Sequence, residues 1–239
     1  MMPAGVDLRL GDWRTALADV EMVDALITDP PYSQRTHAAT AAAARRDPSC
    51  MPNPEKIPPQ IPYACWSDEE AASFVCELAP RCRGWFVVIT SHDLARIFEA
   101  EMKAAGRYVF APVAWVAPGS RIRLGGDGPS NWSCWIVVSR PRCEPYSRWG
   151  TLPGAYVIGN HDSKIVGGKP LQLMRNLVRD YSRPGDLVCD PCCGAGTTAL
   201  ACALESRRCV TSELDPATYA LAKRRLEAGF TPQLPGFAA

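Results

Sequence analysis

Short apolar runs alternate with helix-like segments along most of the chain, and this pattern predicts strands separated by helices. Continuous apolar runs are typical of strands buried on both faces, as in parallel sheets. The predicted strands span residues 8–10, 23–28, 85–90, 108–116, 132–139, 186–189 and 208–211. The predicted helices span residues 67–78, 93–105, 170–181, 197–204 and 216–228, and a shorter helix opens at Gly11-Asp12-Trp13.

This alternation predicts an α/β fold with a doubly wound, mostly parallel sheet. A Gly-rich loop at residues 118–129 joins two of the predicted strands in place of a helix, which predicts an antiparallel strand pair. Residues 33–62 carry many Ala, Pro and Arg residues and no sustained periodicity. We expect them to form a long mobile loop beside the strand at 23–28.

The composition is that of an ordinary globular protein, with 47% hydrophobic and 21% charged residues among 239. This length supports one sizeable core, so we expect a single domain over residues 1–239. No apolar run reaches the length of a membrane span, and residues 1–9 lack the basic start and apolar stretch of a secretion signal. We therefore expect a cytoplasmic protein without a membrane partner.

Eleven cysteines raise the question of disulfides or a metal site. Their number is odd and their spacing is scattered, which favours reduced thiols. Cys189 and Cys192 form one C-x-x-C motif, but no second pair stands at a zinc-finger distance and the chain has only three histidines. The sequence therefore predicts no bound metal.

The formal net charge of +1 is far from the strongly basic balance that usually accompanies nucleic-acid binding. Local clusters can serve the same purpose, and Arg121 and Arg123 lie in the Gly-rich loop. A solvated rim explains these arginines equally well. The charge of the chain therefore neither indicates nor excludes a nucleic-acid partner.

Asp29-Pro30-Pro31-Tyr32 follows directly on the apolar run at 23–28. Two successive prolines lack backbone N–H groups and cannot extend a strand or enter a helix interior, so the chain must leave the sheet there. The exit places an acid, a carbonyl and an aromatic ring at the carboxyl end of a parallel strand, where open α/β sheets usually bind ligands. A plain turn uses the same residue types, so the rest of the chain must decide between a turn and a site.

A second cluster, rich in small residues, joins the strand at 186–189 to the helix at 197–204. It reads Asp190-Pro191-Cys192-Cys193-Gly194-Ala195-Gly196-Thr197-Thr198, and small residues at such a junction let the backbone pass close to a bound nucleoside. Glu213 stands at the end of the next strand, where a carboxylate can accept hydrogen bonds from both ribose hydroxyls. The spacing is typical of a Rossmann-like nucleoside site.

A dehydrogenase offers a competing explanation for this loop. A dinucleotide site favours three glycines and leaves helix N–H groups free for a pyrophosphate. Here Asp190 places negative charge beside the loop, and a carboxylate repels a phosphate. The same charge attracts a cationic ligand, and the sulfonium and amino groups of S-adenosylmethionine have that polarity.

Together these motifs resemble those of the β-class DNA amino-methyltransferases, which occur in restriction–modification systems and phages. Leu10-Gly11-Asp12 resembles the third motif of that family, Asp29-Pro30-Pro31-Tyr32 its catalytic motif, Gly168-Lys169-Pro170-Leu171 its tenth motif and the loop at 190–198 its first, followed by Glu213-Leu214-Asp215. The catalytic motif precedes the cofactor loop, which is the circularly permuted order of the β class. The resemblance covers most of the chain and implies a Rossmann-like methyltransferase sheet with a short target-recognition insertion.

The resemblance implies S-adenosylmethionine as the cofactor. The residues that it assigns to cofactor binding are Asp12, Lys169, Pro170, Asp190, Cys192, Gly194, Gly196, Thr197, Glu213 and Leu214. The chain departs from the family at Cys192, where Phe is usual, and at Gly167 and Gly168, where His-Pro is frequent. Lys169 could equally be a helix-start cation with a solvated head, and Asp215 is expected to cap a helix.

The resemblance also implies the reaction. The exocyclic amine of adenine is a poor nucleophile because its lone pair is delocalised into the ring. The Asp29 carboxylate and the Pro30 carbonyl, within the rigid Pro30-Pro31 exit, would accept the two amine hydrogens and align the nitrogen for direct attack on the sulfonium methyl group. Tyr32 would stack on the target base after the base has left the duplex. In this family Asp at the first motif position favours N6-adenine and Ser favours N4-cytosine, so we expect N6-adenine methylation in DNA.

Target recognition would fall to the region between Tyr32 and His161. No sizeable segment remains for a separate recognition domain, so we expect a short or relaxed target sequence. We also expect a monomer or homodimer. For His37, an exposed loop histidine is favoured over a DNA contact. The candidate DNA contacts are His37, Arg121, Arg123 and Asn131.

Three alternatives stay open. The first is N4-cytosine methylation of DNA. The second is methylation of an RNA or of a protein amine or amide, which related Asn-Pro-Pro motifs perform, although the permuted motif order speaks against it. The third is a catalytically silent DNA-binding partner, against which Asp29, Asp190 and Glu213 speak together.

Overall fold

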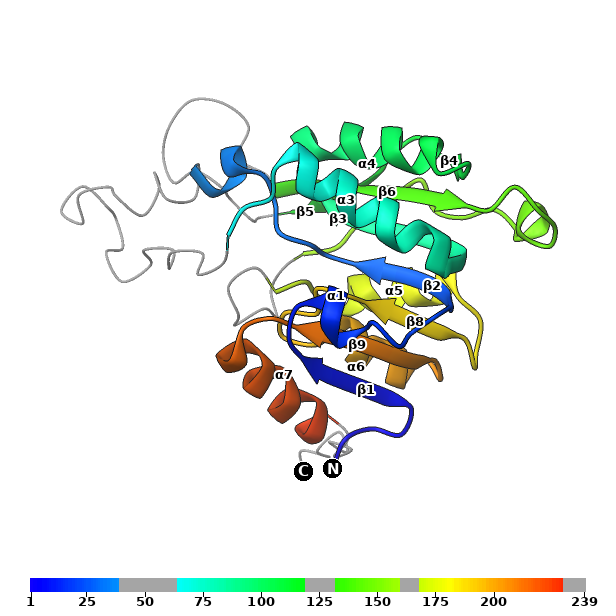
Figure 1. Ribbon diagram of the computed structural model, residues 1–239. Helices are drawn as coiled ribbons and strands as arrows, with labels where there is room; N and C mark the ends of the chain where they lie inside the picture. The colour runs from blue at the N-terminus through cyan, green and yellow to red at the C-terminus, as the bar shows by residue number, and fades with distance from the viewer. Residues whose placement is uncertain (39–63, 119–131, 160–167, 230–239) are drawn as a thin grey trace.

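The computed structural model describes residues 1–38, 64–118, 132–159 and 168–229. These residues contain a nine-stranded sheet in the order β1-β9-β8-β2-β3-β6-β5-β7, with β4 paired to β6 beside this path (Figure 1). The strands are β1 (Val6–Leu10), β2 (Val23–Thr28), β3 (Cys82–Thr90), β4 (Tyr108–Val109), β5 (Val113–Ala117), β6 (Trp132–Arg140), β7 (Ala155–Val157), β8 (Leu187–Asp190) and β9 (Arg208–Glu213).

Helices cover both faces of the sheet. One face carries α1, α3 and α4, of which α3 and α4 lie side by side, and the other carries α5, α6 and α7 (Figure 1). The helices are α1 (Trp13–Ala16), α3 (Asp68–Leu78), α4 (His92–Ala104), α5 (Leu171–Tyr181), α6 (Thr197–Leu204) and α7 (Pro216–Ala228), with 3-10 turns η3 (Ala79–Arg81) and η4 (Tyr146–Arg148). The predicted doubly wound α/β class is confirmed.

Strand direction also follows the prediction. The pairs β1–β9, β9–β8, β8–β2, β2–β3 and β5–β7 are parallel, whereas β6 runs antiparallel to β3, β4 and β5. The strands at the centre are buried on both faces, since nearly every residue of β2 and β3 is shielded from water. This burial is the reason that these strands read as continuous apolar runs.

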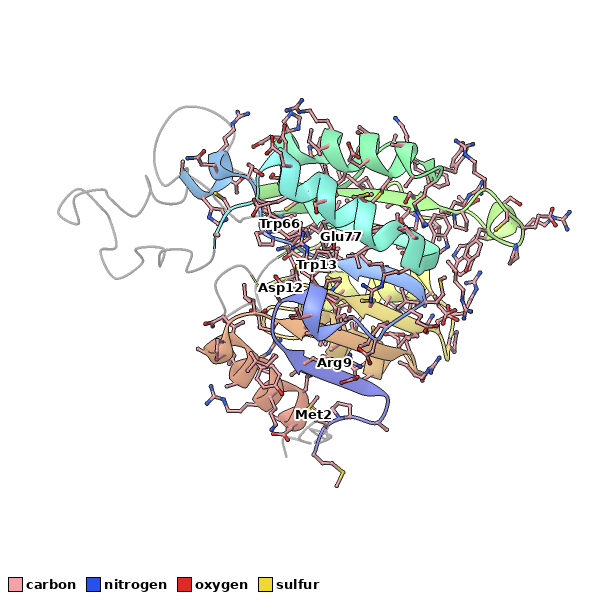
Figure 2. All side chains as sticks on the ribbon, viewed as in Figure 1. Met2, Arg9, Asp12, Trp13, Trp66 and Glu77 are labelled. Carbon is pink, nitrogen blue, oxygen red and sulfur yellow. The ribbon has the colours of Figure 1, made fainter. Side chains whose placement is uncertain are left out.

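The first turn of helix α3 shows how local sequence determines where a helix begins. Ser67 and Glu70 form a capping box, in which each side chain bonds the backbone N–H of the other residue. Trp13, the first residue of α1, and Trp66, just before α3, both pack on Phe74 in the middle of α3, with ring centroids 5.3 and 5.0 Å away (Figure 2). Trp66 also donates its backbone N–H to the carbonyl of Tyr32 at 3.0 Å, which ties the Asp29–Tyr32 exit to the start of α3.

The second half of the sheet differs from the prediction in two places. The strand predicted at 108–116 is two strands, β4 and β5, separated at Pro112, which has no N–H to donate to a ladder. Between them, Phe110 donates its backbone N–H to Val138 at 3.0 Å. β7 has only three residues, and this short strand was not predicted.

None of the helices that the structure describes is long and apolar enough to cross a membrane. The predicted loop at 33–62 falls mostly outside the described residues, but residues 34–38 form a short helical segment where a loop was expected. Most of the Gly-rich loop at 118–129, which falls in the region between Tyr32 and His161 predicted for target recognition, also lies outside them.

Candidate active site

The Asp29-Pro30-Pro31-Tyr32 motif and the small-residue loop meet at the carboxyl ends of two neighbouring parallel strands. β2 leads into Asp29, β8 ends at Asp190, and the two strands pair through Leu26 and Cys189. Thr28 donates a hydrogen bond of 2.7 Å to the Asp190 carboxylate across this pair. Segments that are far apart in the sequence thus form one site, as the placement of both motifs after strands predicts.

After β2 the chain places the side chain of Tyr32 against that of Asp29. Asp29 has a side chain that is 21% exposed, and its Oδ1 accepts a hydrogen bond of 3.0 Å from the Tyr32 hydroxyl. The same hydroxyl lies 3.3 Å from the Cys134 sulfur on β6. Pro30 is buried and Pro31 is half-buried, so these two prolines are largely shielded from water. The acid and the aromatic ring are therefore in direct contact before any substrate arrives.

Lys169, which lies just before α5, contacts the second oxygen of the same acid. Its ammonium forms an ion pair with Asp29 Oδ2, and its side chain is only 9% exposed. Pro170, the next residue, is buried and forms the N-cap of α5. The alternative of a solvated lysine head is wrong, because the ammonium is enclosed beside the acid.

Opposing effects set the pKa of Asp29. Removal from water raises the pKa, because the carboxylate loses hydration. The charge of Lys169 and the hydrogen bonds from Lys169 and Tyr32 lower it, and the net direction is upward. Asp29 is therefore a stronger proton acceptor than an exposed aspartate.

Asp190 is a buried carboxylate, with a residue exposure of 1%. Its Oδ1 accepts hydrogen bonds from the Thr28 hydroxyl at 2.7 Å and from the Cys192 backbone N–H at 3.2 Å. Burial raises the pKa of Asp190 to about 6, the hydrogen bonds from Thr198, Thr28 and Cys192 oppose this rise, and the charge of Asp29 adds to it. A carboxylate in this setting gains from a cationic ligand.

The loop after Asp190 depends on two glycines in the left-handed region, with φ of 51° at Gly194 and 77° at Gly196. A Cβ on Gly196 would lie 3.3 Å from the Cβ of Ala222 on α7, so this glycine permits close packing. A Cβ on Gly194 would have no neighbour within 4 Å among the described residues, so Gly194 borders open space. Thr197 begins α6 and is buried, whereas Cys192 is half-buried.

Two further carboxylates lie at the ends of β1 and β9. Gly11 donates its backbone N–H to the backbone carbonyl of Glu213 at 2.9 Å, which brings Asp12 and Glu213 to the same edge of the sheet. Asp12 caps α1 by accepting a hydrogen bond of 2.8 Å from Arg14 N, and burial raises the pKa of Glu213. Leu214, directly after Glu213, is 69% exposed.

Asp215 caps α7, as predicted, and accepts a hydrogen bond of 2.7 Å from the backbone N–H of Thr218. It is therefore engaged within its own helix.

These strand ends fit S-adenosylmethionine. The carboxylates of Asp190 and Glu213 suit cationic groups and ribose hydroxyls, and the exposed Leu214 suits the face of an adenine ring. The open space beside Gly194 lets a ligand approach the loop backbone. The residues present are therefore of the right chemistry for this cofactor.

Of the candidate DNA contacts, Arg121, Arg123 and Asn131 lie outside the described residues. His37 lies in the segment 34–38, is half-buried, and has its pKa lowered by burial. In the parts of the chain that the structure describes, no group of three or more His, Cys, Asp or Glu gathers as a metal site.

Three residues of the site were not predicted. Thr28 looked like an ordinary strand residue, Cys134 like part of an apolar strand, and Arg225 like a helix surface cation. Arg225 in fact donates to the carbonyl of Ala195 and lies 3.3 Å from the Thr197 hydroxyl, so it braces the small-residue loop. The polar Thr28, which ends the apolar stretch 25–27 of β2, is a signal that could have been used.

Comparisons with known proteins agree with this geometry. A family model described as DNA methylase matches residues 135–224. The Type II methyltransferase M.XycI of Xanthomonas campestris pv. cyanopsidis is 41% identical over 136 residues, which are 51% of this chain and 45% of that protein. The Type II methyltransferase M.Cfr9I of Citrobacter freundii is 38% identical over the same shares. The matched region thus spans less than half the length of these two relatives.

Solved structures share the fold at low sequence identity. The M1.HpyAVI–SAM complex has a TM-score of 0.66 and 19% identity, covering 92% of this chain and 98% of that one. The PvuII DNA methyltransferase, described as cytosine-N4-specific, has a TM-score of 0.63 and 18% identity, covering 100% and 89%. The family model, the curated relatives and the fold together confirm that this chain resembles the DNA amino-methyltransferases.

Proposed function

We propose that this chain is an S-adenosylmethionine-dependent DNA methyltransferase that methylates the exocyclic N6 amine of adenine. The observation that carries the proposal is the contact between two strand ends, at which the acid of the Asp29-Pro30-Pro31-Tyr32 exit lies beside the buried carboxylate of Asp190. The names of the curated relatives and of the structures with the same fold support the reaction class.

The chain's own residues would prepare the amine. Asp29 and the Pro30 carbonyl accept its two hydrogens, so the nitrogen lone pair is drawn out of the ring and aligned. When bound, S-adenosylmethionine supplies a methyl group whose bond electrons stay on the sulfur. The methylated nitrogen releases one proton, and the raised pKa of Asp29 suits it to take that proton up.

Tyr32 would provide the face on which the target base stacks. The base must leave the duplex to reach Asp29, at a cost of a few kcal/mol. Stacking on an aromatic ring returns about 1–3 kcal/mol of that cost. His37, Arg121, Arg123 and Asn131 remain the proposed DNA contacts.

Transfer of a tritiated methyl group tests the reaction class. The intact protein is incubated with labelled cofactor and, separately, with unmethylated DNA, RNA and a mixture of proteins. The proposal predicts label in DNA, and loss of that label in Asp29→Ala. Label in RNA or protein alone, or none in DNA although the cofactor is bound, contradicts it.

The methylated atom needs a separate measurement. An aspartate at the first position of the catalytic motif favours adenine within the family that the chain resembles. Mass spectrometry of nucleosides from treated DNA should therefore find N6-methyladenine. Finding N4-methylcytosine instead would retain the reaction class and replace the target base.

A further inference from the structure

The Asp29 carboxylate is held at both of its oxygens by residues from different parts of the chain. Tyr32 donates to Oδ1 at 3.0 Å, and Lys169 forms an ion pair with Oδ2. Tyr32 is three residues away in sequence, whereas Lys169 is 140 residues away. A carboxylate held from two directions cannot rotate freely about its side-chain bonds.

The Lys169 ammonium is itself enclosed. Its Nζ lies 5.0 Å from the ring centroid of Tyr32 and 6.0 Å from that of Trp115, at distances where aromatic faces attract a cation. Trp115 is fixed in turn by a hydrogen bond of 3.0 Å from its indole N–H to the carbonyl of Ile158. The aromatic rings and the acid therefore define one position for the ammonium.

The charges around Asp29 explain why a cation is needed there. Asp190 lies on the neighbouring strand, and the charges of Asp29 and Asp190 disfavour one another. The charge of Asp29 likewise disfavours ionisation of Cys192 and Tyr32, and Tyr32 in turn contacts the Cys134 thiol. Against these anionic or ionisable groups, Lys169 supplies the compensating positive charge.

We propose that Lys169 is a positioning residue, which keeps the Asp29 carboxylate charged and turned so that Oδ1 faces the incoming amine. Its effect on catalysis rests on the proposed function. In this arrangement the Tyr32 hydroxyl occupies the place on Oδ1 that the amine hydrogen takes, and Lys169 stays on Oδ2. Lys169 thus acts through Asp29 and contributes little to cofactor binding.

The inference predicts a displaced titration. An opposite charge in contact with a carboxylate typically lowers its pKa by about 1–3 units. Neutral replacements Lys169→Met and Lys169→Gln should therefore move the acid limb of the methyl-transfer rate upward by about 1–3 pH units. Lys169→Arg keeps the charge and should leave the limb near its original position.

The titration of Asp29 can also be measured in the free protein, without methyl transfer. Carbon-13 NMR of the aspartate carboxyl groups follows Asp29 in the free protein, with Asp29→Asn to assign the signal. We expect an upward shift in both neutral variants, none in the exposed-lysine control Lys103→Met, and cofactor affinity within about threefold of the parent by calorimetry.

The outcomes separate the two proposals. An unmoved Asp29 titration in folded Lys169→Met and Lys169→Gln overturns the inference, as does a loss of cofactor affinity without a titration shift. If the parent protein transfers no methyl group to DNA, the proposed function fails, yet the NMR titration still decides whether Lys169 controls the charge of Asp29.

Discussion

Thr28 on β2 donates a hydrogen bond of 2.7 Å to Asp190 on β8, although 162 residues separate them in the sequence. Thr28 comes directly before Asp29, and Asp190 comes directly before the small-residue loop. The bond therefore fixes the distance between the proposed methyl acceptor site and the proposed cofactor site. Because both residues are buried, it also matters for stability.

Replacing Thr28 with Val removes the donor and keeps the shape. The buried Asp190 then loses one of the hydrogen bonds that hold down its pKa, so we expect a loss of about 1–3 kcal/mol in the free energy of unfolding at pH 8. Urea denaturation measures it, with Thr28→Ser as a control that keeps the hydroxyl. A stability equal to that of the parent at pH 8 would contradict this role.

The pKa of Asp190 predicts a specific pH dependence of stability. Its folded value of about 6 lies above the ordinary 3.8, so the folded state binds more protons between these values. The contribution of Asp190 is fully present below the lower value and is lost as pH rises through the upper one, at a total cost of about 3 kcal/mol.

Asp190→Asn cannot ionise and can still accept from Thr28 and Cys192, which both donate to Oδ1. The parent loses stability as Asp190 ionises and the variant does not, so the free energy of unfolding of the variant relative to the parent should rise by about 1 kcal/mol from pH 5 to pH 8. We also expect the variant to bind the cofactor more weakly. Denaturation of the unliganded proteins at the two pH values checks the first point. A difference between variant and parent that does not change with pH would show that Asp190 titrates normally.

The two glycines of the loop should respond differently to alanine. Gly196→Ala meets both a left-handed backbone and the Cβ of Ala222 at 3.3 Å, so it should lose about 1–3 kcal/mol of stability. Gly194→Ala meets the left-handed backbone without a crowded neighbour, and its new methyl lies on the loop of the proposed cofactor site, so cofactor affinity should fall more than stability. Calorimetry of unfolding and of binding separates the two, and equal losses of both kinds in the two variants would refute the assignment.

Arg225 connects α7 to the loop through the carbonyl of Ala195 and the hydroxyl of Thr197. Arg225→Met should loosen the loop and weaken cofactor binding about tenfold, equivalent to about 1.4 kcal/mol. Arg224→Met, at an exposed position on the same helix, is the matched control. Similar affinities for both variants would mean that α7 does not support the site.

The repeated strand–helix units could be predicted from sequence because each buried strand is a continuous apolar run and each helix has its own start or stop signal. Ser67 with Glu70 and Asp215 with Pro216 are such signals, and both form the predicted caps. The break between β4 and β5 contains a local signal, Pro112, whereas the short β7 depends on pairing with β5, which local sequence does not specify.

The same distinction applies to the site. Asp29 and Asp190 could be placed together because both follow parallel strands, whose carboxyl ends share one edge of the sheet. The ion pair from Lys169 to Asp29 and the brace from Arg225 to the loop could not, because each joins residues whose contact depends on how helices pack. Long charged side chains carry no spacing signal of this kind.

The rate of a single methyl transfer to DNA, with cofactor binding measured separately, tests the central claim most directly. The account predicts that the parent protein methylates a base in unmethylated DNA. It also predicts that Asp29→Asn binds the cofactor with similar affinity but transfers the methyl group at least about 100-fold more slowly, because the amine loses its anionic acceptor. A folded, cofactor-bound Asp29→Asn that transfers the methyl group as fast as the parent would contradict the assignment of Asp29 and the mechanism built on it.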